Sequence, residues 1–168
     1  MTPQNDSGNS SDIIAFSCNE HIQTLPTKRM AAGALITRGG EILIVEPTYK
    51  ENWEIPGGAI EKDESPRDAL QRELIEELGS QTTIGRPLVI EYQSSTKEKS
   101  ESVMFIFEVI IPDAAQFAIP NEEIKSFRFV PEEHLDQYLV ERLARRLRFA
   151  LKSLSSDRLI YLENGVML

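Results

Sequence analysis

The segment that decides the fold is GGAIEKDESPRDALQRELIEELG, residues 57–79. It opens on two glycines, and its second half carries the signals of a helix. Ser65 is a favoured N-cap residue, Pro66 suits the first helical position, and Gly79 suits the position after the last turn. We therefore predict a glycine loop followed by a helix from Pro66 to about Leu78.

The predicted helix sorts its side chains into two adjoining stripes, given about 100° of rotation per residue. The apolar stripe contains Leu70, Leu74 and Leu78, and the acidic stripe contains Glu73, Glu76 and Glu77. Like charges three and four residues apart repel each other on a bare helix. Cations from elsewhere in the chain or a bound divalent metal would relieve the repulsion, and a merely solvated acidic face is the alternative. Ligands that are all oxygen favour Mg²⁺ or Mn²⁺.

Gly57 and Gly58 stand just before the acidic stripe. Glycines allow the backbone to approach a ligand closely. A glycine loop beside a carboxylate ridge is a place where a metal-bound diphosphate fits, because the metal neutralises phosphate and activates water.

The net charge restricts the partners. The 18 Lys and Arg against 27 Asp and Glu give −9. Binding along a nucleic-acid backbone needs surplus cations, so we expect no nucleic-acid polymer as partner. A small phosphate-bearing ligand remains compatible with this charge if metal ions supply the positive charge.

The length of 168 residues indicates one domain. Residues 1–12 are polar and are expected to form a disordered tail, with a single domain over 13–168. We see no secretory signal and no apolar run long enough to span a membrane, so the predicted compartment is the cytoplasm.

Hydrophobic patterning predicts a mixture of strands and helices, hence one α/β domain with a mixed sheet. Strands are expected at 30–38, 41–47, 53–56, 82–93, 101–111 and 124–131, with an edge strand at 12–17 and a terminal strand or extended tail at 158–165. Gly39 and Gly40 suit a hairpin turn. A second helix is expected at 139–153.

The spacing of Gly58, Glu64, Arg72-Glu73, Glu76-Glu77 and Gly79 resembles the signature of the Nudix hydrolases. Ser80 departs from it, because the pattern expects an aliphatic residue there, and we expect a local packing change. Asp63 stands where many members have glycine. A looser resemblance extends over about residues 30–137.

The resemblance implies a Nudix-type α/β/α sandwich with a mixed sheet, in which the signature forms a loop–helix–loop. It also implies divalent-metal-dependent hydrolysis of a nucleoside diphosphate linked to another moiety. Substrates would be nucleoside triphosphates, including oxidised ones, or nucleotide sugars, with Mg²⁺ as cofactor and Mn²⁺ as a substitute. Homodimers are common in the family.

By the same resemblance, residues take specific roles. The metal ligands would be Glu73, Glu76, Glu77 and the carbonyl of Gly57. The catalytic set would be Glu64, Arg72, Glu76 and Glu123, with Arg72 paired to Glu64 and Glu122 as the alternate to Glu123. Gly57, Gly58 and Trp53 would contact substrate. Which glutamate is the general base stays open.

Other residues have simpler interpretations. Trp53 is expected to pack against the signature helix, with base stacking as the alternative. A solvated helix face is expected for Arg142, Arg145, Arg146, Arg148 and Lys152, with pairing to surface acids or a phosphate or partner contact as the alternatives. His21 and His134 are expected on the surface. Cys18 is expected to be an idle thiol.

Two alternative functions remain. One is a non-catalytic nucleotide-ligand-binding or regulatory module on the same scaffold, which commonly has an eroded signature. The other is an isomerase, which ranks last because Cys18 lies far upstream of the signature.

Overall fold

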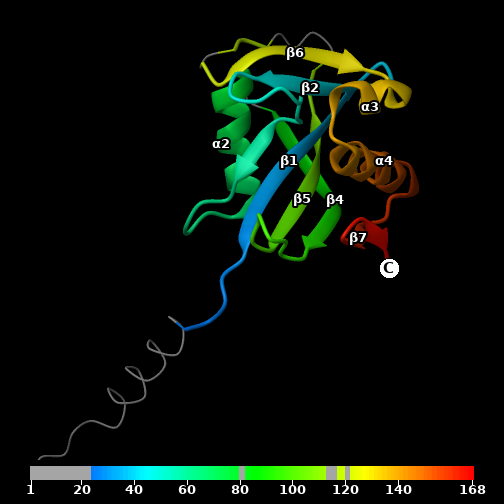
Figure 1. The fold of residues 1–168 in the computed structure, drawn as a ribbon. Coiled ribbons are helices and arrows are strands. Elements are labelled where there is room, and N and C mark those ends of the chain that lie inside the picture. The colour runs from blue at the N-terminus through cyan, green and yellow to red at the C-terminus, as the bar shows by residue number, and fades with distance from the viewer. Residues whose placement is uncertain (1–23, 80–81, 113–116, 120–121) are drawn as a thin grey trace, which may run out of the picture.

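The computed structural model describes residues 24–79, 82–112, 117–119 and 122–168 (Figure 1). The predictions for the tail at 1–12, the edge strand at 12–17, Cys18, His21 and Ser80 lie outside these residues. Within them, no helix is long and apolar enough to cross a membrane.

One mixed sheet organises the molecule, as predicted. Its strands are β1 (Arg29–Arg38), β2 (Glu41–Pro47), β3 (Gly57–Ala59), β4 (Thr83–Gln93), β5 (Ser102–Ile110), β6 (Ile124–Val130), β7 (Ile160–Glu163) and β8 (Val166–Met167). The order is β6-β2-β1-β5-β4-β7-β8, with β3 also paired to β1. The pairs β1–β5 and β4–β7 are parallel and the others antiparallel.

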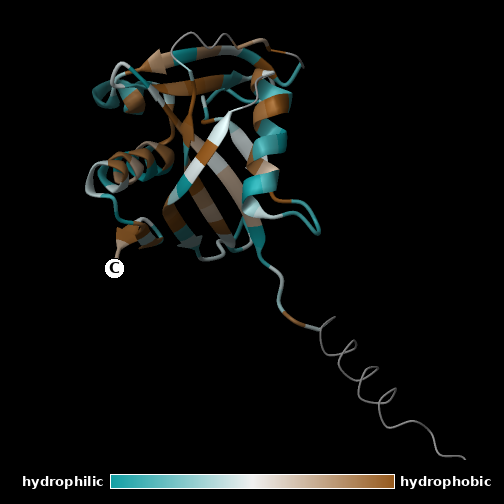
Figure 2. Cartoon of the chain, turned by 180° about the vertical axis from the view of Figure 1, so that it is seen from behind, coloured by the Kyte–Doolittle hydropathy of each residue, from teal (hydrophilic) through white to brown (hydrophobic). Residues whose placement is uncertain are grey.

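A helix covers each face of this sheet, which gives the expected α/β/α sandwich (Figure 1). Helix α2 (Pro66–Leu78) lies on one face and α4 (Glu141–Ser156) on the other. The alternation along β1 explains the two cores: Ala34 and Ile36 face α2, whereas Leu35 belongs to the α4 side. Figure 2 shows hydrophobic residues on the strands between the two helices.

The predicted boundaries of α2 are confirmed. The Ser65 hydroxyl accepts a hydrogen bond from the Asp68 N–H at 3.1 Å, and Gly79 ends the helix with φ of 62°. Leu70, Leu74 and Leu78 are fully buried. The helix is thus fixed by local capping and by one apolar stripe.

The hairpin between β1 and β2 opens almost at once. Gly39 and Gly40 both have positive φ, as a tight turn requires. Only Thr37 and Arg38 pair with β2, which then continues against β6. The opening is filled by residues 54–59, which pair with β2 at Glu54 and with β1 from Gly57 to Ala59.

The predicted strand at 53–56 was placed wrongly, and the predicted second helix is present with shifted ends. The short strand at 53–56 is not formed. Pro56 has no N–H for a ladder, and its carbonyl instead accepts from the Ala34 N–H at 2.9 Å. The strand of this segment is β3, which begins at Gly57, directly after the predicted strand. The second helix begins at Glu141, after a short turn of helix that the sequence did not predict: η1 (Glu132–His134) and α3 (Leu135–Tyr138).

Residues 158–165 were expected to form either a terminal strand or an extended tail, and the structure contains the strand, β7. β7 pairs in parallel with β4, and β8 folds back on β7. His134 is exposed, as expected.

Candidate active site

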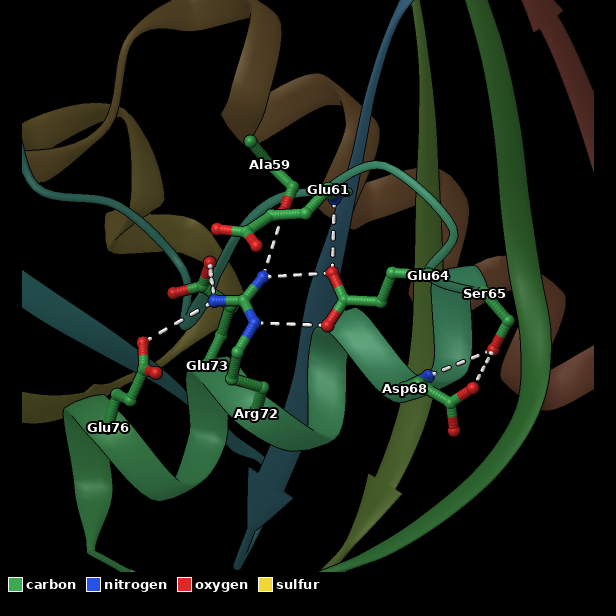
Figure 3. Close-up of polar contacts among 8 residues, drawn as sticks. All are labelled: Ala59, Glu61, Glu64, Ser65, Asp68, Arg72, Glu73 and Glu76. Carbon is green, nitrogen blue, oxygen red and sulfur yellow. Dashed lines mark hydrogen bonds and ion pairs between the residues drawn. The ribbon is translucent and has the colours of Figure 1, made fainter.

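Arg72 connects the glycine loop to the acidic stripe of α2 (Figure 3). Its Nε and Nη2 donate to the two carboxylate oxygens of Glu64, each at 3.0 Å. Its Nη1 donates to Glu73 at 2.8 Å and to Glu76 at 3.4 Å, and Nη2 also donates to the Ala59 carbonyl at 3.1 Å. A planar fork that serves this many acceptors fixes the loop against the helix. The expected pairing of Arg72 with Glu64 is present.

These bonds stabilise the charged forms of both partners. The Arg72 guanidinium and the Glu61 N–H hold the pKa of Glu64 below its usual range. Hydrogen bonding to Glu64 raises the pKa of Arg72.

Glu77 is the most buried carboxyl of the acidic stripe, with 8% of its surface exposed. Its Oε2 accepts a hydrogen bond from the Gly57 N–H at 2.8 Å. Burial raises the pKa of Glu77 to about 8, and the charges of Glu73, Glu54 and Glu123 contribute further. Burial likewise raises the pKa of Glu73, against the opposing effect of Arg72. The local negative charge is therefore only partly compensated.

Both glycines are required for this close approach. Gly57 has φ of 131°, and a Cβ there would lie 2.2 Å from the Ala32 carbonyl oxygen. A Cβ on Gly58 would lie 2.3 Å from the Glu73 Oε1. At Gly57 the obstacle is backbone and φ is positive, so only glycine lets β3 lie against β1 there, whereas a Cβ on Gly58 would displace the Glu73 carboxylate from its present position.

Two further acids face the stripe from other elements. The Glu123 carbonyl accepts from the Thr48 N–H at 2.8 Å, which holds the segment before β6 near the site. Its charge acts on both Glu73 and Glu77. Glu54 acts on Glu77 and was missed by the sequence reasoning, although it stands only three residues before Gly57 in the same segment.

The carboxylates form an oxygen donor set of the kind that hard divalent cations prefer. In the described part of the chain, no three acidic side chains converge closely enough to hold a cation as they stand. Arg72 holds Glu73 and Glu76, and Gly57 holds Glu77. A cation would therefore have to draw these carboxylates away from their present partners.

A cavity of about 790 Å³ begins at this loop. Gly57, Gly58, Glu54 and Glu64 lie at one end, and Arg142 and Arg146 of α4 at the other. Apolar side chains form much of the wall between them: Met30, Ile55, Met104 and Leu143. This volume and lining suit a ligand of nucleotide size.

Trp53 is not among the residues that line the cavity. Its ring packs edge-on against Tyr138 at 5.5 Å, with the Arg128 guanidinium over it at 5.6 Å. Trp53 thus belongs to the α4 side of the sheet, and the expectation that it packs against α2 was wrong. The cause is the turn at α3, which supplies Tyr138 and was not predicted.

Arg146 also departs from expectation. It was placed on a solvated face with the other basic residues of α4, but it is 5% exposed and forms an ion pair with Glu91, which is 1% exposed. Arg146 lies on the same side of α4 as Leu143 and Leu147, so the apolar stripe contains a charge.

Comparison with known proteins follows this geometry. A family model described as NUDIX domain matches residues 27–150. The chain belongs to this family. Among curated proteins, the NUDIX chain is 40% identical to the CTP pyrophosphohydrolase of Escherichia coli (strain K12) over 85 residues, which cover 48% of the chain and 59% of that protein. It is 32% identical to the nucleoside triphosphatase NudI of Escherichia fergusonii over 115 residues, which cover 63% of the chain and 79% of NudI.

Solved structures share the NUDIX fold. The crystal structure of UDP-X diphosphatase matches with a TM-score of 0.69 at 22% identity, covering 93% of this chain and 76% of the other. The solution structure of the Escherichia coli ORF135 protein matches with a TM-score of 0.62 at 28% identity, covering 79% and 94%. The family and the predicted sandwich are thereby confirmed.

Proposed function

We propose that this protein is a divalent-metal-dependent hydrolase that cleaves a diphosphate bond in a nucleoside diphosphate linked to another moiety. The observation that carries the proposal is the buried acid Glu77 and the half-buried acid Glu73, set against Gly57 and Gly58, which line a nucleotide-sized cavity. The names of the two relatives, a CTP pyrophosphohydrolase and a nucleoside triphosphatase, support nucleoside triphosphates as the first substrates to test. Nucleotide sugars are the second class, supported by the family resemblance.

In this proposal Glu73, Glu76, Glu77 and the Gly57 carbonyl hold Mg²⁺, or Mn²⁺ in its place. The bound cation would neutralise the diphosphate and lower the pKa of water. Every ligand is a hard oxygen, which fits either ion.

The remaining residues position the reacting groups. Arg72 is the positioning residue, since its bonds to Glu64 and Ala59 hold the glycine loop in register with α2. Gly57 and Gly58 line the cavity, so phosphate oxygens bound there would lie against the backbone of this loop. A carboxylate of Glu64, Glu76 or Glu123 accepts the proton of the attacking water. Glu54 joins these candidates, because it lines the cavity and acts on Glu77.

The decisive test is hydrolysis of a panel of nucleoside triphosphates, oxidised triphosphates and nucleotide sugars with Mg²⁺ or Mn²⁺. We expect turnover by the wild type and a loss of at least about a hundredfold in Glu77→Gln. Glu133→Gln is the matched control, because Glu133 is an exposed acid on η1. Absence of turnover on the whole panel, or equal rates in the two variants, would contradict the proposal.

A non-catalytic ligand-binding module remains the alternative function, and it predicts nucleotide binding without any hydrolysis. The intact set of Glu64, Arg72, Glu73, Glu76 and Glu77 supports catalysis instead.

The proposal also includes a single domain over 13–168, a cytoplasmic location and a homodimer. Size measurement in solution tests the last of these.

A further inference from the structure

A second cavity of about 190 Å³ adjoins the first. Arg29, Met104, Arg142 and Arg146 are among the residues that line both, so the two are continuous. The second is closed by the connection between β4 and β5 and by the start of β5. The connection contributes Ser94, Thr96, Lys99 and Ser100, and β5 contributes Ser102.

The charge of this second cavity is opposite to that of the chain. Arg29, Lys99, Arg142 and Arg146 line it, and among the lining residues that the structure describes there is no aspartate or glutamate. The chain as a whole carries −9. The remaining polar lining is mostly hydroxyl, and hydroxyls with arginine and lysine are the donors that bind phosphate oxygens.

Arg146 forms the buried end of this wall. Its Nε is committed to Glu91, but no residue that the structure describes accepts a hydrogen bond from its two terminal amino groups. Arg146 is 5% exposed, and its terminal amino groups are not among the described buried atoms that lack a partner, so they reach the open space of the cavities that Arg146 lines. A ligand in this space can accept hydrogen bonds from them.

The Glu91 carboxylate interacts with two guanidinium groups, with Arg146 directly and with Arg142 through Gln93. The Gln93 amide donates to Glu91 at 3.2 Å, and its oxygen accepts from Arg142 at 2.8 Å. Glu91 therefore compensates Arg146 directly and Arg142 only through Gln93. The other nearby acid, Glu101, is bound to Lys28 at 2.7 Å and to the Tyr92 hydroxyl at 2.8 Å. A net positive charge is left facing the cavity.

We propose that this second cavity is a subsite for a phosphate group of the substrate that is remote from the scissile diphosphate. The inference rests on the proposed function for the identity of the substrate. The sheet separates the two sites: β3, which carries Gly58, is three strand spacings from β4, which carries Gln93. That is roughly 14 Å, and it is bridged by the apolar part of the first cavity. The substrate class is therefore a nucleoside diphosphate derivative with an additional phosphate on its nucleoside or on the linked moiety.

The first experiment measures the subsite without catalysis. Inorganic phosphate is titrated into metal-free protein in EDTA, and backbone amide shifts are followed by NMR. We expect saturable shifts at residues 94–102. We expect affinity to fall about tenfold in Arg142→Ala and about threefold in Lys99→Ala. Lys97→Ala is the control, since Lys97 lies in the same connection but does not line the cavity. No shift at 94–102, or an equal loss in Lys97→Ala, would overturn the subsite.

The second experiment asks whether substrate uses the subsite. Hydrolysis with Mg²⁺ is compared within two pairs that differ by one phosphate, NADPH against NADH and coenzyme A against dephospho-coenzyme A. We expect a lower KM for the phosphorylated member of a pair, and loss of that preference in Lys99→Ala. Equal KM values within each pair that is hydrolysed would overturn the substrate class. Failure of the proposed function looks different, because it abolishes turnover on every diphosphate and leaves phosphate binding intact. Hydrolysis of neither pair, with turnover of other nucleoside diphosphate derivatives, would also overturn the substrate class.

Discussion

The ion pair between Glu91 and Arg146 can be tested by breaking it and then replacing it. Both residues are almost fully buried, on β4 and α4. Removing one charge leaves the other in a medium of low polarity without its partner, which costs about 3–5 kcal/mol of unfolding free energy. We therefore expect Glu91→Leu and Arg146→Met each to be destabilised by this amount. For a chain of this length, the loss corresponds to a fall in Tm of roughly 10 °C.

The double variant carries the sharper information. With Leu and Met facing each other, no charge is buried, and such replacements are commonly neutral or stabilising. We expect the double variant to lie within about 2 kcal/mol of the wild type, so the two single effects are strongly non-additive. Urea denaturation followed by circular dichroism gives the four free energies, provided that the m-values agree. Single variants within about 1 kcal/mol of the wild type, or a double variant that shows the sum of both losses, would refute this reasoning.

Four further predictions follow from the loop and helix at 57–79. Ser65→Ala removes the cap bond to the Asp68 N–H and should cost about 1 kcal/mol in urea denaturation, whereas Ser95→Ala in an exposed connection should cost almost nothing. Gly57→Ala should cost clearly more than about 1 kcal/mol, because its φ and the Ala32 carbonyl both exclude a Cβ. Gly58→Ala should cost less stability, since the obstacle is the end of the Glu73 side chain, and calorimetric titration should show weakened metal binding. Glu77→Gln should raise the Tm of metal-free protein in EDTA at pH 8 and have less effect at pH 5. Burial raises the pKa of Glu77 to about 8 in the folded protein, whereas the unfolded chain releases this proton from about pH 4.5. The free energy of unfolding of the wild type therefore falls progressively between about pH 4.5 and pH 8. A Tm for Glu77→Gln no higher than the wild type at pH 8 would contradict this.

The elements with local signals were the ones that the sequence predicted well. α2 has a cap residue, a proline, an apolar stripe and a terminal glycine within one short segment, and all of them act as expected. The pairing of Arg72 with Glu64 spans only eight residues of this segment, and the family resemblance implied it.

The missed features depend on contacts between distant segments. Glu54 reaches the site because β1 and β2 separate and admit residues 54–59 between them. Trp53 was assigned to the wrong helix because Tyr138, its partner, comes from a turn 85 residues later with no strong pattern of its own. Neither arrangement leaves a periodic signal in the sequence.

Arg146 is a different case, because a signal was present. It falls between Leu143 and Leu147 on the buried stripe of α4, and Glu91 directly follows the apolar run Leu88–Ile90 of β4. Two isolated opposite charges on buried faces indicate a partner for each. The sequence does not reveal that β4 and α4 are neighbours in the fold, so it could not identify these two charges as partners of each other.

Binding of Mn²⁺, measured by electron paramagnetic resonance in the absence of nucleotide, tests the central claim most directly. The claim is that the acidic stripe of α2 holds a divalent cation beside the glycine loop. We predict saturable Mn²⁺ binding by the wild type and by Glu133→Gln, and an affinity at least about tenfold weaker in Glu77→Gln. Equal Mn²⁺ affinity in all three proteins would contradict it.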